Sequence, residues 1–120
     1  MSPKRILIID DDTELCEELI DSLISEGYEA ERAPDAIQGE KFIRSNNYDV
    51  ILLDYKMPLF SGLDILNKLK TDNIKKKIII ITGRPSAEKM IEEDGLSDMI
   101  SGIISKPIDF KVLLEKIREL

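Results

Sequence analysis

The sequence contains no histidine, and it has one cysteine, Cys16. Without histidine, the chain cannot build a Ser–His or Cys–His catalytic pair or a histidine-based zinc site. A single cysteine cannot form an internal disulfide, which favours a reducing, cytoplasmic setting. The apolar run in the opening MSPKRILIIDDD is too short for a signal peptide, and no apolar stretch is long enough to cross a bilayer. The sequence therefore predicts a cytoplasmic protein with no membrane association.

Positive charge is also in short supply. The chain has 17 Lys and Arg against 24 Asp and Glu, which gives a net charge of −7. This balance argues against direct binding of nucleic acid or of an anionic membrane by this chain. With 120 residues, 42% apolar and 34% charged, the composition is typical of one globular domain, and we expect a single domain over 1–120.

Short β-rich runs alternate with helical patterns from end to end. Residues 5–10, 50–54 and 77–82 are unbroken apolar runs, typical of strands buried on both faces of a parallel sheet. The more polar run 28–33 indicates an edge strand, and 102–105 is the shortest strand candidate. This order predicts an α/β fold of (βα)₅ type, with a parallel sheet covered by helices on both faces.

Each helix between these strands has a recognisable start. Asp12 or Asp11, Asp35, Ser61 with Asp64, and Asp109 are the expected N-caps. The predicted inward side chains are Leu15, Cys16, Leu19 and Leu23 in the first helix, Ile37, Phe42 and Ile43 in the second, Ile65, Leu66 and Leu69 in the third, and Phe110, Leu113, Leu114 and Ile117 in the last. Gly39 weakens the second helix by about 1 kcal/mol relative to Ala. A short fourth helix over 86–94 has only Ala87, Met90 and Ile91 as an apolar face.

Polar residues stand where the long strands end. Asp10 and Asp11 follow the first strand, Asp54 ends the third, Thr82 ends the fourth, and Lys106 follows the fifth. Ligands of such sheets bind beyond the carboxyl ends of the strands, so these side chains should converge. Carboxylates without His or Cys favour a hard divalent ion such as Mg²⁺. Together with Thr and Lys, this set is suited to holding a phosphoryl group, and Asp54 is the candidate nucleophile.

Four segments carry a family resemblance. These are IIDDD at the first strand end, YDVILLDYKMPLFSGLDIL around the third strand, IIIITG at the fourth and ISKPI at the fifth. Over essentially its whole length the chain resembles the receiver domain of two-component response regulators, in the CheY-like superfamily. The resemblance implies a three-layer, doubly wound parallel sheet of flavodoxin/CheY-like type, with strand order 2-1-3-4-5.

The resemblance also implies a role for each site residue. Asp54 would be the phosphoacceptor, receiving a phosphoryl group from the phosphohistidine of a sensor histidine kinase or a phosphotransfer protein. The implied ligands of Mg²⁺ (or Mn²⁺) are Asp11 directly, Asp10 mainly through water, Asp54, and the backbone carbonyl of Lys56. Thr82 would meet the phosphoryl group, and Lys106 would pair with it.

Further expectations follow from the same resemblance. Met57-Pro58 and Gly62 match the turn beneath the site, and the Lys106–Pro107 bond is expected to be cis. The chain would act as a switch rather than an enzyme, with only self-phosphorylation and autodephosphorylation. It would act on an output domain or a partner protein, with a phosphorylation-dependent dimer as an option, either as a stand-alone regulator or as a piece of a larger regulator or hybrid kinase.

The sequence departs from the family between 83 and 103. Ile103 stands where receivers usually carry Tyr or Phe, so aromatic switching is not expected here. Met99 and Gly83 replace a common Gly and a common Ala. Lys56 and Arg84 occupy positions that, in receivers, help to set the phosphoryl lifetime. We expect the fourth helix and the loop that follows it to be irregular or mobile.

Two alternative functions remain. A phosphatase of the haloacid-dehalogenase type also uses a strand-end Asp, but its Asp-x-Asp-x-Thr/Val motif would fall on Asp10-x-Asp12, where Glu14 follows, and the chain is short of a cap domain. A pseudo-receiver would act as a phosphorylation-independent scaffold, although every chemical position is filled. Dinucleotide binding is excluded because no Gly-x-Gly-x-x-Gly follows the first strand.

Overall fold

The computed structural model describes residues 4–57 and 61–120, which form alternating strands and helices. The strands are β1 (Arg5–Ile9), β2 (Glu29–Ala33), β3 (Val50–Asp54), β4 (Ile78–Thr82) and β5 (Gly102–Ser105). The helices are α1 (Thr13–Ser25), α2 (Ala36–Ser45), α3 (Gly62–Thr71), α4 (Ala87–Glu93) and α5 (Phe110–Arg118), with a short 3₁₀ helix, η1 (Ser97–Met99), after α4. Along the described ranges, none of the helices has both the length and the apolar character needed to span a bilayer.

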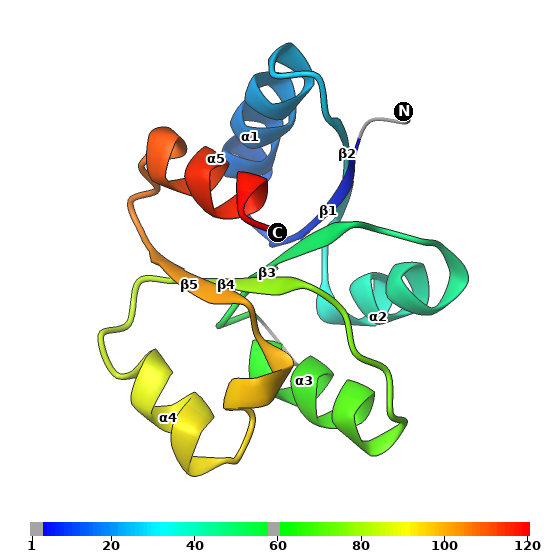
Figure 1. The fold of residues 1–120 in the computed structure, drawn as a ribbon, viewed down its shortest axis with the longest axis vertical. Coiled ribbons are helices and arrows are strands. Elements are labelled where there is room, and N and C mark those ends of the chain that lie inside the picture. Colours follow the sequence, from blue (N-terminus) through cyan, green and yellow to red (C-terminus); the bar gives the residue numbers. More distant parts are fainter. Residues whose placement is uncertain (1–3, 58–60) are drawn as a thin grey trace.

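The five strands form one parallel sheet in the order β2-β1-β3-β4-β5, which confirms the predicted topology. Helices α1 and α5 cover one face, and α2, α3 and α4 cover the other (Figure 1). The more polar β2 is an edge strand, as its sequence indicates. Strand order reverses at β1 and β3, so the carboxyl ends of these two neighbours are where a ligand site is expected.

Local capping signals place the helix starts correctly. The side chain of Asp12 accepts a hydrogen bond from the Leu15 N–H at 3.1 Å, and Asp35 caps α2 in the same way. Ser61 and Asp64 form the predicted capping box of α3, and Asp109 caps α5. By contrast, α4 has seven residues and no side-chain hydrogen bond at its cap, and η1 follows it, so the expected irregularity is confirmed.

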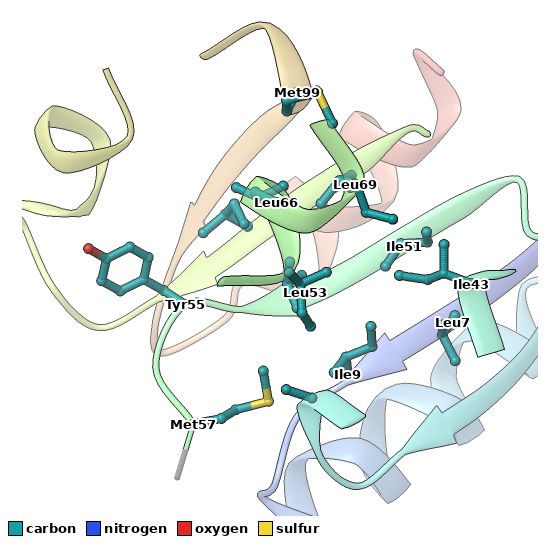
Figure 2. Close-up of a cluster of buried hydrophobic side chains, with 14 of the residues drawn as sticks. Leu7, Ile9, Ile43, Ile51, Leu53, Tyr55, Met57, Leu66, Leu69 and Met99 are labelled. Atoms are coloured by element: carbon teal, nitrogen blue, oxygen red, sulfur yellow. The ribbon is translucent and has the colours of Figure 1, made fainter. Parts of the chain in front are cut away.

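Two hydrophobic clusters, one on each face of the sheet, make up the core. Leu7, Ile9, Ile51 and Leu53 project toward α2 and α3, where Ile43, Leu66 and Leu69 meet them (Figure 2). The alternate residues of the same strands, including Ile6, Ile8 and Leu52, pack against α1 and α5. Because the central strands are buried on both faces, they carry no alternation of polar and apolar residues.

Two of the predicted inward side chains point elsewhere. Ile37 is 49% exposed and Met90 is 42% exposed, so these two predictions are wrong. Helix α2 instead buries Ala36, Gly39 and Ile43, which are spaced three and four residues apart on one stripe. Each position along a helix turns by about 100°, which carries Ile37 away from that stripe. Met90 is displaced in the same way from the buried pair Ala87 and Ile91 of α4.

Gly39 has a packing role that the sequence does not reveal. A Cβ atom at this position would lie 2.7–3.0 Å from three side-chain carbons of Ile9, and Ile9 is fully buried. We therefore expect Gly39→Ala to destabilise the protein by about 1–3 kcal/mol, although Ala favours the helix by about 1 kcal/mol. Urea unfolding measures this change.

Gly83→Ala is the matched control for this substitution. A Cβ at Gly83 would meet its nearest neighbour, the Lys106 Cβ, at 4.0 Å, an ordinary contact, so its stability should stay within about 0.5 kcal/mol. A stabilised Gly39→Ala variant would contradict the packing argument and leave helix propensity as the dominant effect.

Candidate functional site

Three carboxylates meet at the carboxyl ends of β1 and β3. Ile9 and Leu53 are paired in the sheet, so the residues that follow them, Asp10 and Asp54, stand side by side. One oxygen each from Asp10, Asp11 and Asp54 lies within 4.8 Å of the others. Asp10 is fully buried, Asp54 is 5% exposed, and Asp11 is exposed to solvent. The site is therefore a half-open acidic pocket, as the strand ends predict.

Lys106 reaches the same pocket from the end of β5. Its Nζ lies 3.3 Å from Asp10 Oδ2 and 3.5 Å from Asp54 Oδ1. The Lys106 N–H donates to the Thr82 carbonyl at 2.7 Å, which ties this residue to the end of β4. The peptide bond to Pro107 is cis, as expected. One cation thus stands against two buried carboxylates.

The electrostatics of the pocket raise the proton affinity of its central acid. Burial first, and then the charge of Asp10, raise the pKa of the Asp54 carboxyl to about 6, against the lowering effects of Lys106 and of the Lys56 N–H. Burial lowers the pKa of the Lys106 ammonium, but Asp54 and Asp10 outweigh it, and the net direction is upward. Asp54 is therefore mostly ionised at pH 7 but close to its titration range.

The free energy of unfolding should depend on pH because of the titration of Asp54. Because the folded state holds the Asp54 proton more tightly than the unfolded chain, this group favours folding at low pH, and that contribution is lost as pH rises from about 4 through about 6. We expect the loss to be roughly 2–3 kcal/mol of unfolding free energy. It is measured as the difference between wild type and Asp54→Asn in urea unfolding without divalent cations. A pH-independent difference would contradict it.

The donor set fits a hard divalent cation. Asp10 Oδ1 accepts the Asp12 N–H at 2.9 Å, whereas Oδ2 is buried and accepts no hydrogen bond from the residues that the structure describes. The polar neighbour of Oδ2 is the Lys106 ammonium at 3.3 Å. A buried oxygen with spare acceptor capacity, beside two further carboxylates, is the oxygen-only environment that Mg²⁺ prefers.

Thr82 lies at the same edge, but its hydroxyl is engaged locally. Thr82 Oγ1 accepts the Arg84 N–H at 2.9 Å and donates to the Arg84 carbonyl at 3.5 Å. The Lys56 N–H lowers the pKa of the Asp54 carboxyl, while the Lys56 side chain is exposed. The expected roles of the Thr82 hydroxyl and of the Lys56 carbonyl stay predictions.

The turn after β3 explains one glycine of the motif. The Gly62 N–H donates to the Tyr55 carbonyl at 2.8 Å, and a Cβ at Gly62 would lie 2.7 Å from the Asp54 carbonyl oxygen. Glycine is therefore required where α3 begins against the end of β3. Met57 is buried in the core, and Pro58, the other expected turn residue, lies outside the described residues.

Two further residues, Cys16 and Arg32, lie beside the acids, and the sequence predicted the role of only the first. Cys16 is buried in the α1 face, and burial, followed by the Asp10 charge, raises the pKa of its thiol to about 11, which fits the expected packing role. Arg32 was missed: its guanidinium donates two hydrogen bonds to the Asp10 carbonyl. An arginine in a polar edge strand gives no sequence signal of such a contact.

The structure also describes the segment 83–103, where the sequence departs from the receiver family. Ile103 is half-buried and packs against the core cluster that faces α3 and α4. Beside it lies a cavity of about 400 Å³, whose lining includes Ile91, Ile100 and Lys116.

Fold and site together define a class: a doubly wound parallel α/β domain with an acidic, lysine-bearing pocket at its strand ends. A family model described as the response regulator receiver domain matches residues 6–118. The chain belongs to the response regulator receiver domain family. Membership implies a part in two-component signalling, and domains of this family generally act in signalling rather than in catalysis.

Curated relatives and solved structures agree with this assignment. The response regulator MprA of Mycobacterium sp. (strain KMS) is 32% identical over 118 residues, which cover 98% of this chain and 50% of that protein. The chain thus spans about half the length of the curated relatives it matches. A CheY-like receiver domain protein from Methanospirillum hungatei is 36% identical with a TM-score of 0.86, covering 98% of this chain and 93% of the other. TrrA from Thermotoga maritima, solved in complex with Mg²⁺-BeF, is 32% identical with a TM-score of 0.82, and 97% of each chain is covered.

Proposed function

We propose that this chain is a phosphorylatable receiver in a histidine–aspartate phosphorelay, with Asp54 as the phosphoacceptor. The observation that carries the proposal is the convergence of Asp10, Asp11, Asp54 and Lys106 in one pocket. The phosphoryl donor would be the phosphohistidine of a sensor histidine kinase or of a phosphotransfer protein. The result of transfer is a change in affinity for an output domain or a partner protein.

Asp10, Asp11 and Asp54, with the Lys56 carbonyl, are the residues that would hold Mg²⁺ or Mn²⁺. A bound dication would neutralise charge on the oxygens of the transferring phosphoryl group. The fully buried Asp10 would be held in place by its neighbours, while Asp11 is exposed to solvent and would be open to an ion from solution. The similarity to TrrA, which was solved with Mg²⁺-BeF, supports this assignment.

Transfer requires an ionised Asp54. Its carboxylate oxygen forms a bond to phosphorus as the phosphorus–nitrogen bond of phosphohistidine breaks, and the electron pair of that bond returns to the imidazole. With a pKa of about 6, Asp54 is available as the anion at pH 7. Lys106, already 3.5 Å from Asp54, would pair with the phosphoryl oxygens. Thr82 would leave its bonds with Arg84 to donate its hydroxyl to them.

The test is incubation with acetyl phosphate and Mg²⁺, followed by intact-mass measurement and assay of released phosphate. One stoichiometric, acid-stable and base-labile phosphoryl group supports the receiver. Steady turnover of phosphate esters would instead indicate a phosphatase, and no reaction with acetyl phosphate would indicate a scaffold. The phosphatase alternative has little structural support because Asp12, the second acid of its motif, caps α1.

Several broader properties belong to the same proposal. We take residues 1–120 as one receiver domain that works in the cytoplasm. Direct nucleic-acid binding is not part of its role, since the chain carries a net charge of −7. A phosphorylation-dependent dimer is an additional mode of output.

A further inference from the structure

Within the residues that the structure describes, the side-chain hydrogen bonds of Arg32 all go to one main-chain oxygen. On β2, Glu29 and Glu31 face Arg5, with which both form ion pairs. Arg32 lies on the opposite side of the strand, is half-buried, and forms no ion pair with any residue in 4–57 or 61–120. Its Nε and Nη2 each lie 3.3 Å from the Asp10 carbonyl oxygen.

This fork completes a clamp on the backbone of Asp10. The Asp10 N–H donates to the Ala33 carbonyl at 3.4 Å, and the Asp10 carbonyl accepts the two Arg32 bonds. Cys16 Sγ is a third donor to that carbonyl, at 3.6 Å. The end of β2 therefore holds Asp10 on both sides of its Cα, and the side chain is then oriented by the Asp12 N–H.

The clamp matters because the carboxylates of the site repel one another. Carboxylate oxygens of Asp10, Asp11 and Asp54 lie within 4.8 Å of one another, and Lys106 is the cation paired with them within the described ranges. Without a brace, the segment after β1 would relax to separate these charges, and a metal ion would have to gather them again. A planar guanidinium whose two donors converge on one carbonyl oxygen fixes the position of that oxygen better than a single point charge does.

We propose that Arg32 is a positioning residue for the divalent-cation site, holding the Asp10–Asp11 segment in its metal-binding arrangement through the Asp10 carbonyl. The inference rests on the proposed function, because it assumes that these acids bind Mg²⁺. Arg32 does not touch the ion or the phosphoryl group. If its effect were only electrostatic, removing its positive charge would strengthen cation binding; if it positions the ligands, removal weakens it. The two explanations predict opposite signs.

Mg²⁺ titration by calorimetry at pH 7.5 separates these two explanations, with the 120-residue wild type, Arg32→Gln, Arg32→Lys and Arg118→Gln. We expect about 10-fold weaker Mg²⁺ binding for Arg32→Gln, as is typical for outer-shell partners of metal ligands. Arg32→Lys retains the charge and a donor but loses the planar pair of donors, so its Mg²⁺ affinity should lie between those of Arg32→Gln and wild type, within about 3-fold of wild type. Arg118→Gln removes the same charge at the far end of α5, where Arg118 pairs with Glu26, and should leave the affinity unchanged.

Cys16 provides a readout that does not depend on metal. It is the only cysteine, and it contacts the same carbonyl as Arg32, so its alkylation rate in the native protein reports opening of this segment. We expect Arg32→Gln to raise that rate at least 10-fold at an unchanged melting temperature. Loss of the Arg32 charge alone would raise the thiol pKa and slow the reaction, so a faster reaction reports movement.

Each outcome decides a separate question. Equal or tighter Mg²⁺ binding by Arg32→Gln, with wild type binding normally, overturns the role of Arg32 and leaves the proposed function intact. Failure of the wild type to bind Mg²⁺ overturns both. If Arg32→Gln does not fold, Arg32→Lys decides the matter: an affinity more than 3-fold below wild type with unchanged Cys16 alkylation overturns the clamp.

Discussion

Asp54→Asn should abolish phosphorylation completely. Wild-type protein incubated with acetyl phosphate and Mg²⁺ is expected to gain the mass of one phosphoryl group, and the variant none, because an amide has no anionic oxygen to attack phosphorus. The fold should persist, since Asn is nearly isosteric and removes a charge that lies buried against Asp10. At pH 7 we expect the variant to be more stable than the metal-free wild type.

Asp12→Asn is the matched control for this substitution. It removes a carboxylate from the same acidic run, but Asn is as good an N-cap as Asp, so α1 should keep its start. Its phosphorylation should match that of wild type within about twofold. Phosphoryl transfer that persists in Asp54→Asn, or that disappears in Asp12→Asn, would place the acceptor elsewhere.

Lys106→Met should have the second largest effect, on both stability and phosphorylation. Removal of the ammonium leaves Asp10 and Asp54 buried without a partner cation, and breaking such a pair is strongly destabilising. Because the Lys106 side chain is 30% exposed, we expect about 2–3 kcal/mol at pH 7 rather than the full penalty of a fully buried pair. The rate of phosphorylation by acetyl phosphate should fall at least tenfold.

The pH dependence identifies the cause of this loss. Without Lys106 the pKa of Asp54 should rise further above its value of about 6, so the variant regains stability as pH falls from 7 to 5 and Asp54 takes up a proton. Lys111→Met, which changes a lysine on the exposed side of α5, serves as the control and should change stability by less than about 0.5 kcal/mol. A loss in Lys106→Met that stays constant between pH 5 and 7 would point to packing instead of charge.

The positions of the strands, the distinction between buried strands and the polar edge strand, and most helix starts were predictable because their sequence signals are local. A run such as VILLD indicates a buried strand, and an Asp, or a Ser followed by Asp, marks the first turn of each capped helix. The weakness of α4 was predictable for the same reason, since its sequence offers few apolar positions. The prediction that Ile37 and Met90 point inward was wrong because periodicity defines the apolar stripe of a helix only to within one position. The neighbouring elements decide which residue of the helix is buried.

For the site, the sequence alone determined which chemistry-bearing residues end the strands, and the parallel alternation of strands and helices implied that they meet. Only the tertiary structure decided that Lys106 spans Asp10 and Asp54, that burial raises the pKa of Asp54, that Gly39 leaves room for Ile9, and that Arg32 holds the Asp10 carbonyl. Strand ends and caps depend on neighbours along the chain. Distances, burial and proton affinities depend on groups far apart in the sequence, and they acquire values only when the sheet brings those groups together.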